Sequence, residues 1–177
     1  METKIILDTN VPTMAAIAPN KCSSDKLEIQ KKCIDYIYNL TKGKTKLVLD
    51  MGYEIFNEYI NNVEKNTNIG DIFLKWLYSY IAKIDMSNFL MLEKDDNKEF
   101  VSFPINEDTK NFDPSDRKFV ALANIHPEKP PIIEGTDAKW WGYKEAFLKY
   151  GIKIHFLDEE YAQRMYQKKI LDRKPIL

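Results

Sequence analysis

The chain has 177 residues, of which 44% are hydrophobic and 30% charged, and its formal net charge is −1 at pH 7. A chain of this length and composition predicts one globular domain over residues 1–177 and excludes intrinsic disorder and a strongly basic nucleic-acid binder. No apolar run reaches the roughly 20 residues of a membrane-spanning helix, the acidic N-terminus does not resemble a secretory signal, and two cysteines give no disulfide framework, so we expect a cytoplasmic protein outside the membrane.

Four short apolar runs lack the alternation of a half-exposed strand, which predicts buried parallel strands. They lie at residues 4–8 (KIILD), 46–50 (KLVLD), 131–135 (PIIEG) and 152–157 (IKIHFL). Residues 89–92 and 99–103 predict a fifth strand or a small hairpin.

Helical patterns fill the segments between these runs. Apolar residues recur with helical spacing at 25–40, 53–63, 72–84, 116–125, 139–150 and 158–169. Strands that alternate with helices predict an α/β fold with a mostly parallel central sheet.

Acidic residues stand at the carboxyl ends of two predicted strands. Asp8 ends the first strand, and Asp137 follows the run at 131–135. Ligands of an open parallel sheet bind beyond the carboxyl ends of its strands, so both acids are candidates for one site. The simpler interpretation of either acid alone is that it ends a strand and caps the following helix.

Two glutamates, Glu54 and Glu58, share one face of the predicted helix at 53–63 because they lie four residues apart. Such a like-charge pair costs a few tenths of a kcal/mol, a cost that a nearby cation would relieve. Glu54 alone also fits a solvated acid in the first turn, where the helix dipole favours it. The pattern leaves both residues open as site candidates.

A third pair of acids opens the predicted helix at 116–125. Asp113 followed by Pro114 is typical of a helix start, and Asp116 then stands in the first turn. Capping explains both acids without any chemistry. It does not explain why four strand or helix ends carry an acid in this order.

The order of these acids resembles the PIN domain, a family of metal-dependent nucleases that includes toxin ribonucleases, and the resemblance covers most of the chain. The sequence ILDTN, with Asp8 as a metal ligand, is similar to the first motif of that family. Glu58 in NEY is similar to the second motif, with Glu54 as the fallback. Asp116 before a small apolar helix is similar to the third motif, and Asp137 after Thr136 to the fourth. The family often has a further Asp where this chain has Lys139.

The resemblance implies a three-layer α/β/α sandwich with strand order 3-2-1-4-5 and an endoribonuclease that depends on Mg²⁺ or Mn²⁺. The implied metal-binding and catalytic residues are Asp8, Glu58, Asp116 and Asp137. The residues that would support them are Asn10, Glu54, Asp113 and Thr136. RNA is the implied substrate, and membership among the toxins would add a homodimer and an inhibitory antitoxin protein.

The chemistry of such a site follows from its donor atoms. Mg²⁺ and Mn²⁺ prefer oxygen ligands, and carboxylates that converge without a cation repel one another. A bound divalent ion lowers the pKa of water and neutralises charge on the scissile phosphate, and a second ion ~3.5–4 Å away can stabilise the leaving oxygen. The scarcity of histidine is no obstacle, because this chemistry needs none.

Three alternatives remain open at this point. One is a PIN-like scaffold that binds nucleic acid or protein without cleaving it. Another is a structure-specific DNA nuclease, for which the chain is short. A third is a phosphatase of the haloacid dehalogenase type, but Asn10 stands where that family has its second Asp.

Candidate contacts with nucleic acid come from two basic segments and one aromatic side chain. Residues 21–46 contain seven lysines against three acids, and residues 164–177 contain five basic residues against one acid. Lysines of these segments can contact phosphates, although solvated helix faces are the commoner explanation. Trp140 can stack on a base. The candidate contacts are Lys21, Lys31, Lys32, Trp140, Lys168 and Lys169.

Overall fold

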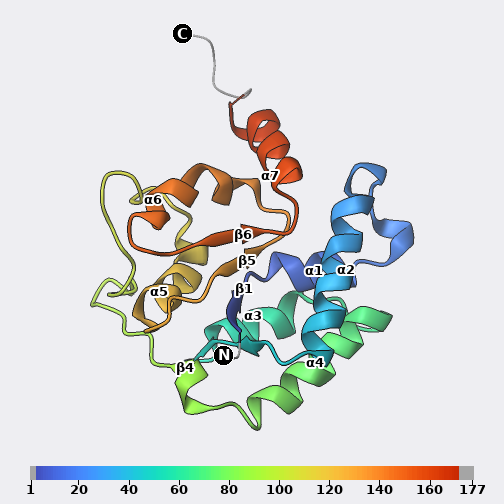
Figure 1. The fold of residues 1–177 in the computed structure, drawn as a ribbon, viewed down its shortest axis with the longest axis horizontal. Coiled ribbons are helices and arrows are strands. Elements are labelled where there is room, and N and C mark those ends of the chain that lie inside the picture. Colours follow the sequence, from blue (N-terminus) through green and yellow to red (C-terminus); the bar gives the residue numbers. More distant parts are fainter. Residues whose placement is uncertain (1–2, 172–177) are drawn as a thin grey trace.

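The computed structural model describes residues 3–171, and the strands of this region pair only in parallel, as a four-stranded sheet and an adjoining two-stranded sheet at the centre of the molecule (Figure 1). The strands are β1 (Lys4–Leu7), β2 (Lys46–Leu47), β3 (Leu49–Asp50), β4 (Phe89–Leu90), β5 (Ile132–Glu134) and β6 (Ile154–Phe156). β1 is paired on both sides, with β2 and with β5, and β5 pairs in turn with β6. The four predicted apolar runs therefore all contribute strands.

The segment predicted as one strand at 46–50 changes partner in its middle. β2 pairs with β1, whereas β3 pairs with β4. Only Val48 separates β2 from β3, and its N–H still donates a hydrogen bond to the carbonyl of Ile5 at 2.8 Å. Counted as a single strand, the segment gives the order 3-2-1-4-5 that the resemblance implied. Doubly wound folds share this order, so it fixes the fold class and not a family.

Helices connect these strands. The α-helices are α1 (Asn10–Ala16), α2 (Leu27–Lys42), α3 (Glu54–Asn62), α4 (Asn68–Ile81), α5 (Arg117–Ile125), α6 (Lys144–Leu148) and α7 (Glu159–Tyr166). Shorter turns of 3₁₀-helix are η1 (Pro19–Lys21), η2 (Ser24–Lys26), η3 (Met86–Asn88), η4 (Pro114–Asp116) and η5 (Ala138–Tyr143). A π-helical turn, η6 (Gln167–Leu171), follows α7. Among the described residues, no helix combines the length and apolar character needed to cross a membrane.

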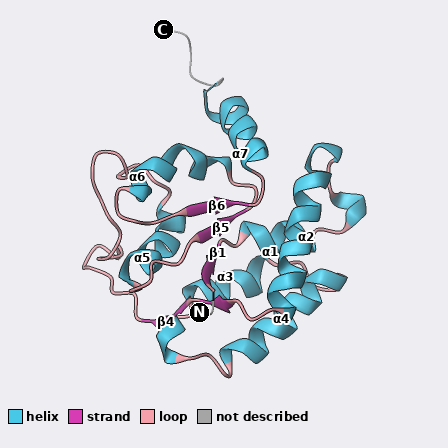
Figure 2. Ribbon diagram, viewed as in Figure 1, coloured by secondary structure: helices cyan, strands magenta, loops and turns pink. Residues whose placement is uncertain are grey.

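The helices lie on both sides of the sheet, which confirms the predicted α/β class. Figure 2 shows α1, α2 and α4 on one side of β1 and β5, and α5 and α6 on the other. On the first side α1 packs against α2 and α4, while on the second α5 contacts β1 and β5. With helices on both faces, Ile5, Ile6 and Leu7 of β1 are at most 2% exposed. This burial explains why the strand sequence is a continuous apolar run.

Several predicted boundaries are wrong, each for a local reason. α4 begins four residues before the predicted helix, because the Thr67 hydroxyl accepts the N–H of Gly70 and caps it. The helix predicted at 139–150 opens as η5 before it becomes α6. Within the described chain, residues 99–103 form no strand, and an isolated bridge between Lys94 and Phe100 is what remains of the hairpin.

Candidate acidic site

Asp8 lies at the centre of the candidate site. It directly follows β1, is 4% exposed, and its Oδ1 accepts hydrogen bonds from the backbone N–H of Asn10 at 2.9 Å and from its Nδ2 at 2.6 Å. Burial raises the pKa of Asp8 well above its usual value, and the charges of the other three predicted ligands, Asp116, Asp137 and Glu58, raise it further. The fold therefore brings all four predicted metal ligands within electrostatic range of one another.

Asp116 reaches this cluster from the start of α5. It is the last residue of η4 and stands at the N-cap position of α5, as the Asp113-Pro114 pattern predicted within a residue or two. Burial raises the pKa of Asp116 to about 6, and the charges of Asp113 and Asp137 act in the same direction. Lys118 opposes this rise.

Asn10 links the segment that follows β1 with the segment that follows β5. Its Oδ1 accepts the backbone N–H of Gly135 at 2.9 Å and that of Thr136 at 3.0 Å, while its Nδ2 donates to Asp8. A Cβ atom at Gly135 would lie 2.9 Å from Asn10 Oδ1, so glycine is what permits this close approach. The side-chain amide of Asn10 therefore fixes the turn after β5 and brings Thr136 close to Asp8.

Glu134 is a fifth acid of the site that the sequence analysis missed. It ends β5 and is 0% exposed, and its Oε1 accepts the N–H of Asp137 at 2.9 Å. Its Oε2 is buried and has no hydrogen-bond partner among the described residues. Burial, followed by the charge of Asp8, raises the pKa of Glu134 well above its usual value. The sign of Glu134 in the sequence was an acidic residue inside an otherwise apolar strand.

A lysine of the chain itself neutralises Glu58. Lys118 Nζ lies 2.5 Å from Glu58 Oε2, and the Lys118 side chain is only 7% exposed. The same ammonium donates to the backbone carbonyl of Ser115. Glu54 points elsewhere and pairs with Lys94 at 2.6 Å. Of the two glutamates that the sequence left open, Glu58 is therefore the one in the cluster.

A second lysine, Lys139, connects two further acids at the edge of the cluster. Its Nζ lies 3.0 Å from Asp113 Oδ2, and its backbone N–H donates to Asp137 Oδ1 at 3.0 Å. The bond from Lys139, followed by that from Ser115, lowers the pKa of Asp113 to about 2. Lys139 therefore brings a cation to the edge of the acidic cluster.

The donor set of the cluster fits a hard divalent cation, whereas the present arrangement of the side chains does not yet form a metal site. Among the described residues, no three His, Cys, Asp or Glu side chains converge closely enough to hold an ion. The carboxylate of Glu58 is turned to Lys118, and that of Asp137 caps η5. The unpartnered Oε2 of Glu134 and the raised pKa of Asp8 are features that a bound cation would relieve.

The residues predicted to contact nucleic acid are one tryptophan, which is buried, and five lysines, which are exposed or partly exposed. Trp140 is 0% exposed, so the prediction that it stacks on a base is wrong, and its ring packs against Phe112. Lys21 pairs with Glu64 at 2.5 Å and Lys32 with Asp158 at 2.7 Å. Both of these lysine side chains remain accessible, at 61% and 41% exposure, and Lys31, Lys168 and Lys169 are exposed as well.

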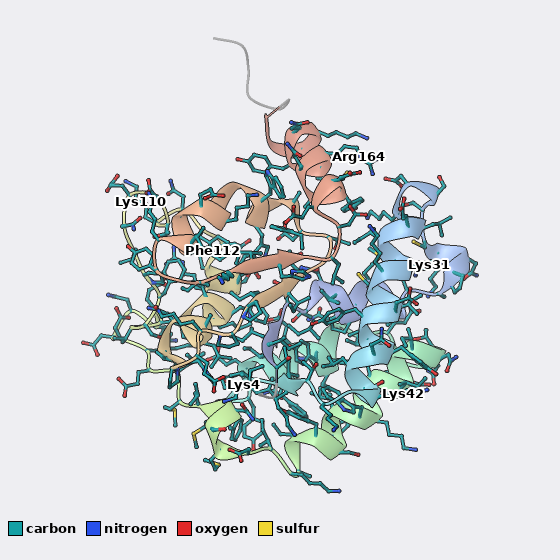
Figure 3. All side chains as sticks on the ribbon, in the orientation of Figure 1. Lys4, Lys31, Lys42, Lys110, Phe112 and Arg164 are labelled. Atoms are coloured by element: carbon teal, nitrogen blue, oxygen red, sulfur yellow. The ribbon has the colours of Figure 1, made fainter. Side chains whose placement is uncertain are left out.

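Two of these lysines, Lys32 and Lys168, lie where α2 approaches α7. In Figure 3, Lys31 on α2 and Arg164 on α7 mark the two helices. The Lys32–Asp158 pair joins α2 to the residue that caps α7. Because β6 runs parallel to β1, Asp158 is at the same edge of the sheet as Asp8. Lys31 and Lys32, near the start of α2, are thus placed toward the edge that carries the acids, whereas Lys42 stands at the other end of this helix.

The acidic cluster leads to a prediction for the metal-free protein: its stability should fall as the pH rises from about 4 to 6. Asp116 has a pKa of about 6 in the fold and 3.8 in an unstructured chain. Between these values the folded protein holds more protons than the unfolded chain, so raising the pH favours unfolding, and the loss is complete above the higher value. Thermal unfolding in EDTA at several pH values measures this slope.

The matched variant for this measurement is Asp116→Asn, whose side chain stays neutral over this pH range because an amide does not titrate. Its midpoint of unfolding should decline less than that of the parent protein between pH 4 and 6. The difference between the two curves removes contributions from other groups, such as the buried His126, whose pKa burial lowers. Identical slopes in the two proteins would contradict the prediction.

Comparison with protein-family models, with curated proteins and with solved structures gives no match for this chain. Its function is therefore inferred from the residues of the site.

Proposed function

We propose that the protein is a metal-dependent endoribonuclease that hydrolyses phosphodiester bonds with Mg²⁺ or Mn²⁺. The observation that carries this proposal is the gathering of two buried acids, Asp8 and Glu134, and three half-buried ones at the carboxyl edge of the parallel sheet, where Asp8 and Asp116 both have raised pKa values. Carboxylates packed in this way at neutral pH are unfavourable without a cation, and Mg²⁺ and Mn²⁺ prefer oxygen ligands. The preference for RNA rests on the resemblance to the PIN domain.

The residues of the cluster divide into metal ligands and residues that position them in the proposed nuclease. Asp8, Asp116 and Asp137 would hold the ion, with Glu58 as a fourth ligand once it leaves Lys118. When bound, the ion lowers the pKa of a water molecule and neutralises charge on the scissile phosphate. Asn10 keeps the carboxylate of Asp8 oriented, and Glu134 fixes the backbone at Asp137 through its hydrogen bond.

A second candidate function is a scaffold that binds nucleic acid or protein without cleaving it. The observation that favours it is the ion pair between Lys118 and Glu58, because a buried ammonium already neutralises part of the acidic cluster. In such a scaffold Lys118 would take the place of the metal. The two functions differ in whether the cluster binds a divalent ion.

The resemblance to the toxin members of the PIN family adds three further features to the proposal. They are a cytoplasmic location, a homodimer, and an antitoxin protein that inhibits cleavage. A DNA substrate is an alternative outcome of the cleavage assay.

The direct test of metal binding is thermal unfolding with Mn²⁺. A ligand at 100 times its Kd stabilises a protein by about 2.7 kcal/mol, which for a chain of this size raises the midpoint by roughly 5–10 °C. We expect this rise in the parent protein and a much smaller one in Asp8→Asn. Mg²⁺ should act in the same way at higher concentration.

The scaffold makes the opposite prediction. Its unfolding midpoint should be the same in EDTA, Mg²⁺ and Mn²⁺. An equal rise in the parent protein and in Asp8→Asn would place the ion elsewhere and overturn the assignment of this site.

A further inference from the structure

A cleft of about 610 Å³ opens beside the acidic site, between the loop before η4, the η5 turn and the end of α7. Two of its lining residues, Asp113 and Lys139, also belong to the edge of the acidic cluster. The cleft is therefore next to the point where the proposed nuclease would hold a phosphate. None of the predicted nucleic-acid contacts lines it.

The walls of the cleft are aromatic. Phe112, which Figure 3 labels, is buried, and the ring of Tyr143 meets its ring edge-on with centroids 5.1 Å apart. On the other side the ring of Tyr166 lies over Gly142, so closely that a Cβ at Gly142 would be 2.7 Å from its hydroxyl oxygen. Tyr143 and Tyr166 are both partly exposed and present ring surface to the cleft.

Polar groups at the rim complete a site of mixed character. Asp113 and Lys139 form an ion pair whose side chains are 31% and 54% exposed, so both remain accessible to a ligand. Asn111 adds an amide that can both donate and accept a hydrogen bond. Flat aromatic walls with donors and acceptors at the rim match the faces and the edge of a nucleobase.

We infer that this cleft binds an unpaired nucleobase of the substrate strand, next to the phosphate that the acidic site would cleave. The inference rests on the proposed function and adds to it the recognition of single-stranded nucleic acid. Base stacking on aromatic side chains is the general means by which proteins hold single strands, and it tolerates every base. The buried Trp140 cannot serve this purpose, whereas Tyr143 and Tyr166 can.

The test is binding of the four ribonucleoside 5′-monophosphates in EDTA, followed by NMR, with ribose 5-phosphate as the probe that lacks a base. The backbone amides of Lys139, Gly142 and Tyr143 should shift with the nucleotides, and at least one nucleotide should bind several-fold more tightly than ribose 5-phosphate. Tyr166→Ala should weaken that binding by about 5- to 150-fold, the range expected for loss of one stacking contact. Tyr166→Phe retains the ring and should bind within about twofold of the parent protein.

Lys139→Gln is a second variant, on an exposed side chain whose replacement leaves the core intact. It should weaken nucleotide binding by about 2- to 10-fold, as expected for loss of a hydrogen bond. Thermal unfolding of each variant confirms that it is folded. The inference is overturned if ribose 5-phosphate binds as tightly as the nucleotides, if no nucleotide binds, or if Tyr166→Ala binds them unchanged.

RNA cleavage with Mn²⁺, measured separately, distinguishes failure of the cleft from failure of the proposed function. If RNA is cleaved in a manner that depends on Asp8 but no nucleotide binds, the nucleobase-binding cleft is wrong and the proposed nuclease stands. If nucleotides bind in a manner that depends on Tyr166 but no RNA is cleaved, the nucleobase-binding cleft stands and the protein is better described as a binding scaffold.

Discussion

Replacing Asp8 with Asn should lower Mn²⁺-dependent cleavage of single-stranded RNA by on the order of 10³-fold, while it makes the metal-free protein more stable. Activity should fall because the central carboxylate of the cluster is lost. Stability should rise because a buried charge that Asp116, Asp137 and Glu58 repel is removed, with little change in side-chain shape. The measurements are cleavage of a labelled RNA and thermal unfolding in EDTA.

The opposite signs of these two effects separate a functional role from a structural one. A residue that only supports the fold would lose stability together with activity. The matched control is Asp35→Asn, which changes the charge equally at an exposed position of α2 and should leave both measurements unchanged. Full cleavage activity in Asp8→Asn would show that Asp8 has no part in the proposed site.

Replacing Asn10 with Ala should destabilise the protein and abolish cleavage together. The backbone N–H groups of Gly135 and Thr136 would lose their shared acceptor. An unsatisfied buried donor costs about 1–3 kcal/mol, so for the two donors we expect a total loss of about 2–6 kcal/mol in the free energy of unfolding. Denaturant unfolding measures this loss, and the Mn²⁺-dependent cleavage assay measures the effect on activity.

Asn10→Asp is the matched variant, because it retains the acceptor for Gly135 and Thr136 but places a carboxylate beside Asp8 in place of an amide donor. At neutral pH it should be less stable than the parent protein in EDTA, and Mn²⁺ should restore much of the difference. If Asn10→Ala were as stable and as active as the parent protein, the hydrogen bonds of Asn10 would have no part in shaping the site.

The strands and most of the helices of this fold could be predicted from local patterns. β1 and β5 are buried on both faces, so their sequences are apolar runs that any reading of periodicity detects. The division of residues 46–50 into β2 and β3 could not be predicted, because it depends on which neighbour each half meets in the sheet. Strand order came from a resemblance and not from the residues themselves.

The candidate site was predictable to the extent that the topology fixes it. Asp8 and Asp137 were expected together because parallel neighbouring strands end at one edge of the sheet. Glu134 was missed, because one acid in an apolar run gives no sign of the direction in which its side chain points. The pairing of Glu58 with Lys118 joins α3 to α5, and no spacing along the sequence indicates such a contact.

The prediction for Trp140 failed for the same reason, because the sequence does not indicate in which direction a side chain points. Of two adjacent tryptophans, one usually faces the core, and the sequence alone does not say which. In the fold Trp140 is enclosed by Phe112 and Phe147, while the accessible aromatic surface near the acids belongs to Tyr143 and Tyr166. These tyrosines lie 23 residues apart in the chain, in η5 and α7, and only the tertiary structure brings them to one cleft.

The ion pair between Lys118 and Glu58 has a consequence for how the proposed nuclease would respond to its metal. Molecules in which Glu58 is held by Lys118 offer one ligand fewer than molecules in which the pair is open. The apparent affinity for the ion is then the intrinsic affinity reduced by the fraction of open molecules. The strength of the Lys118–Glu58 ion pair would thus set the concentration of free divalent ion at which half of the molecules hold the ion and can cleave.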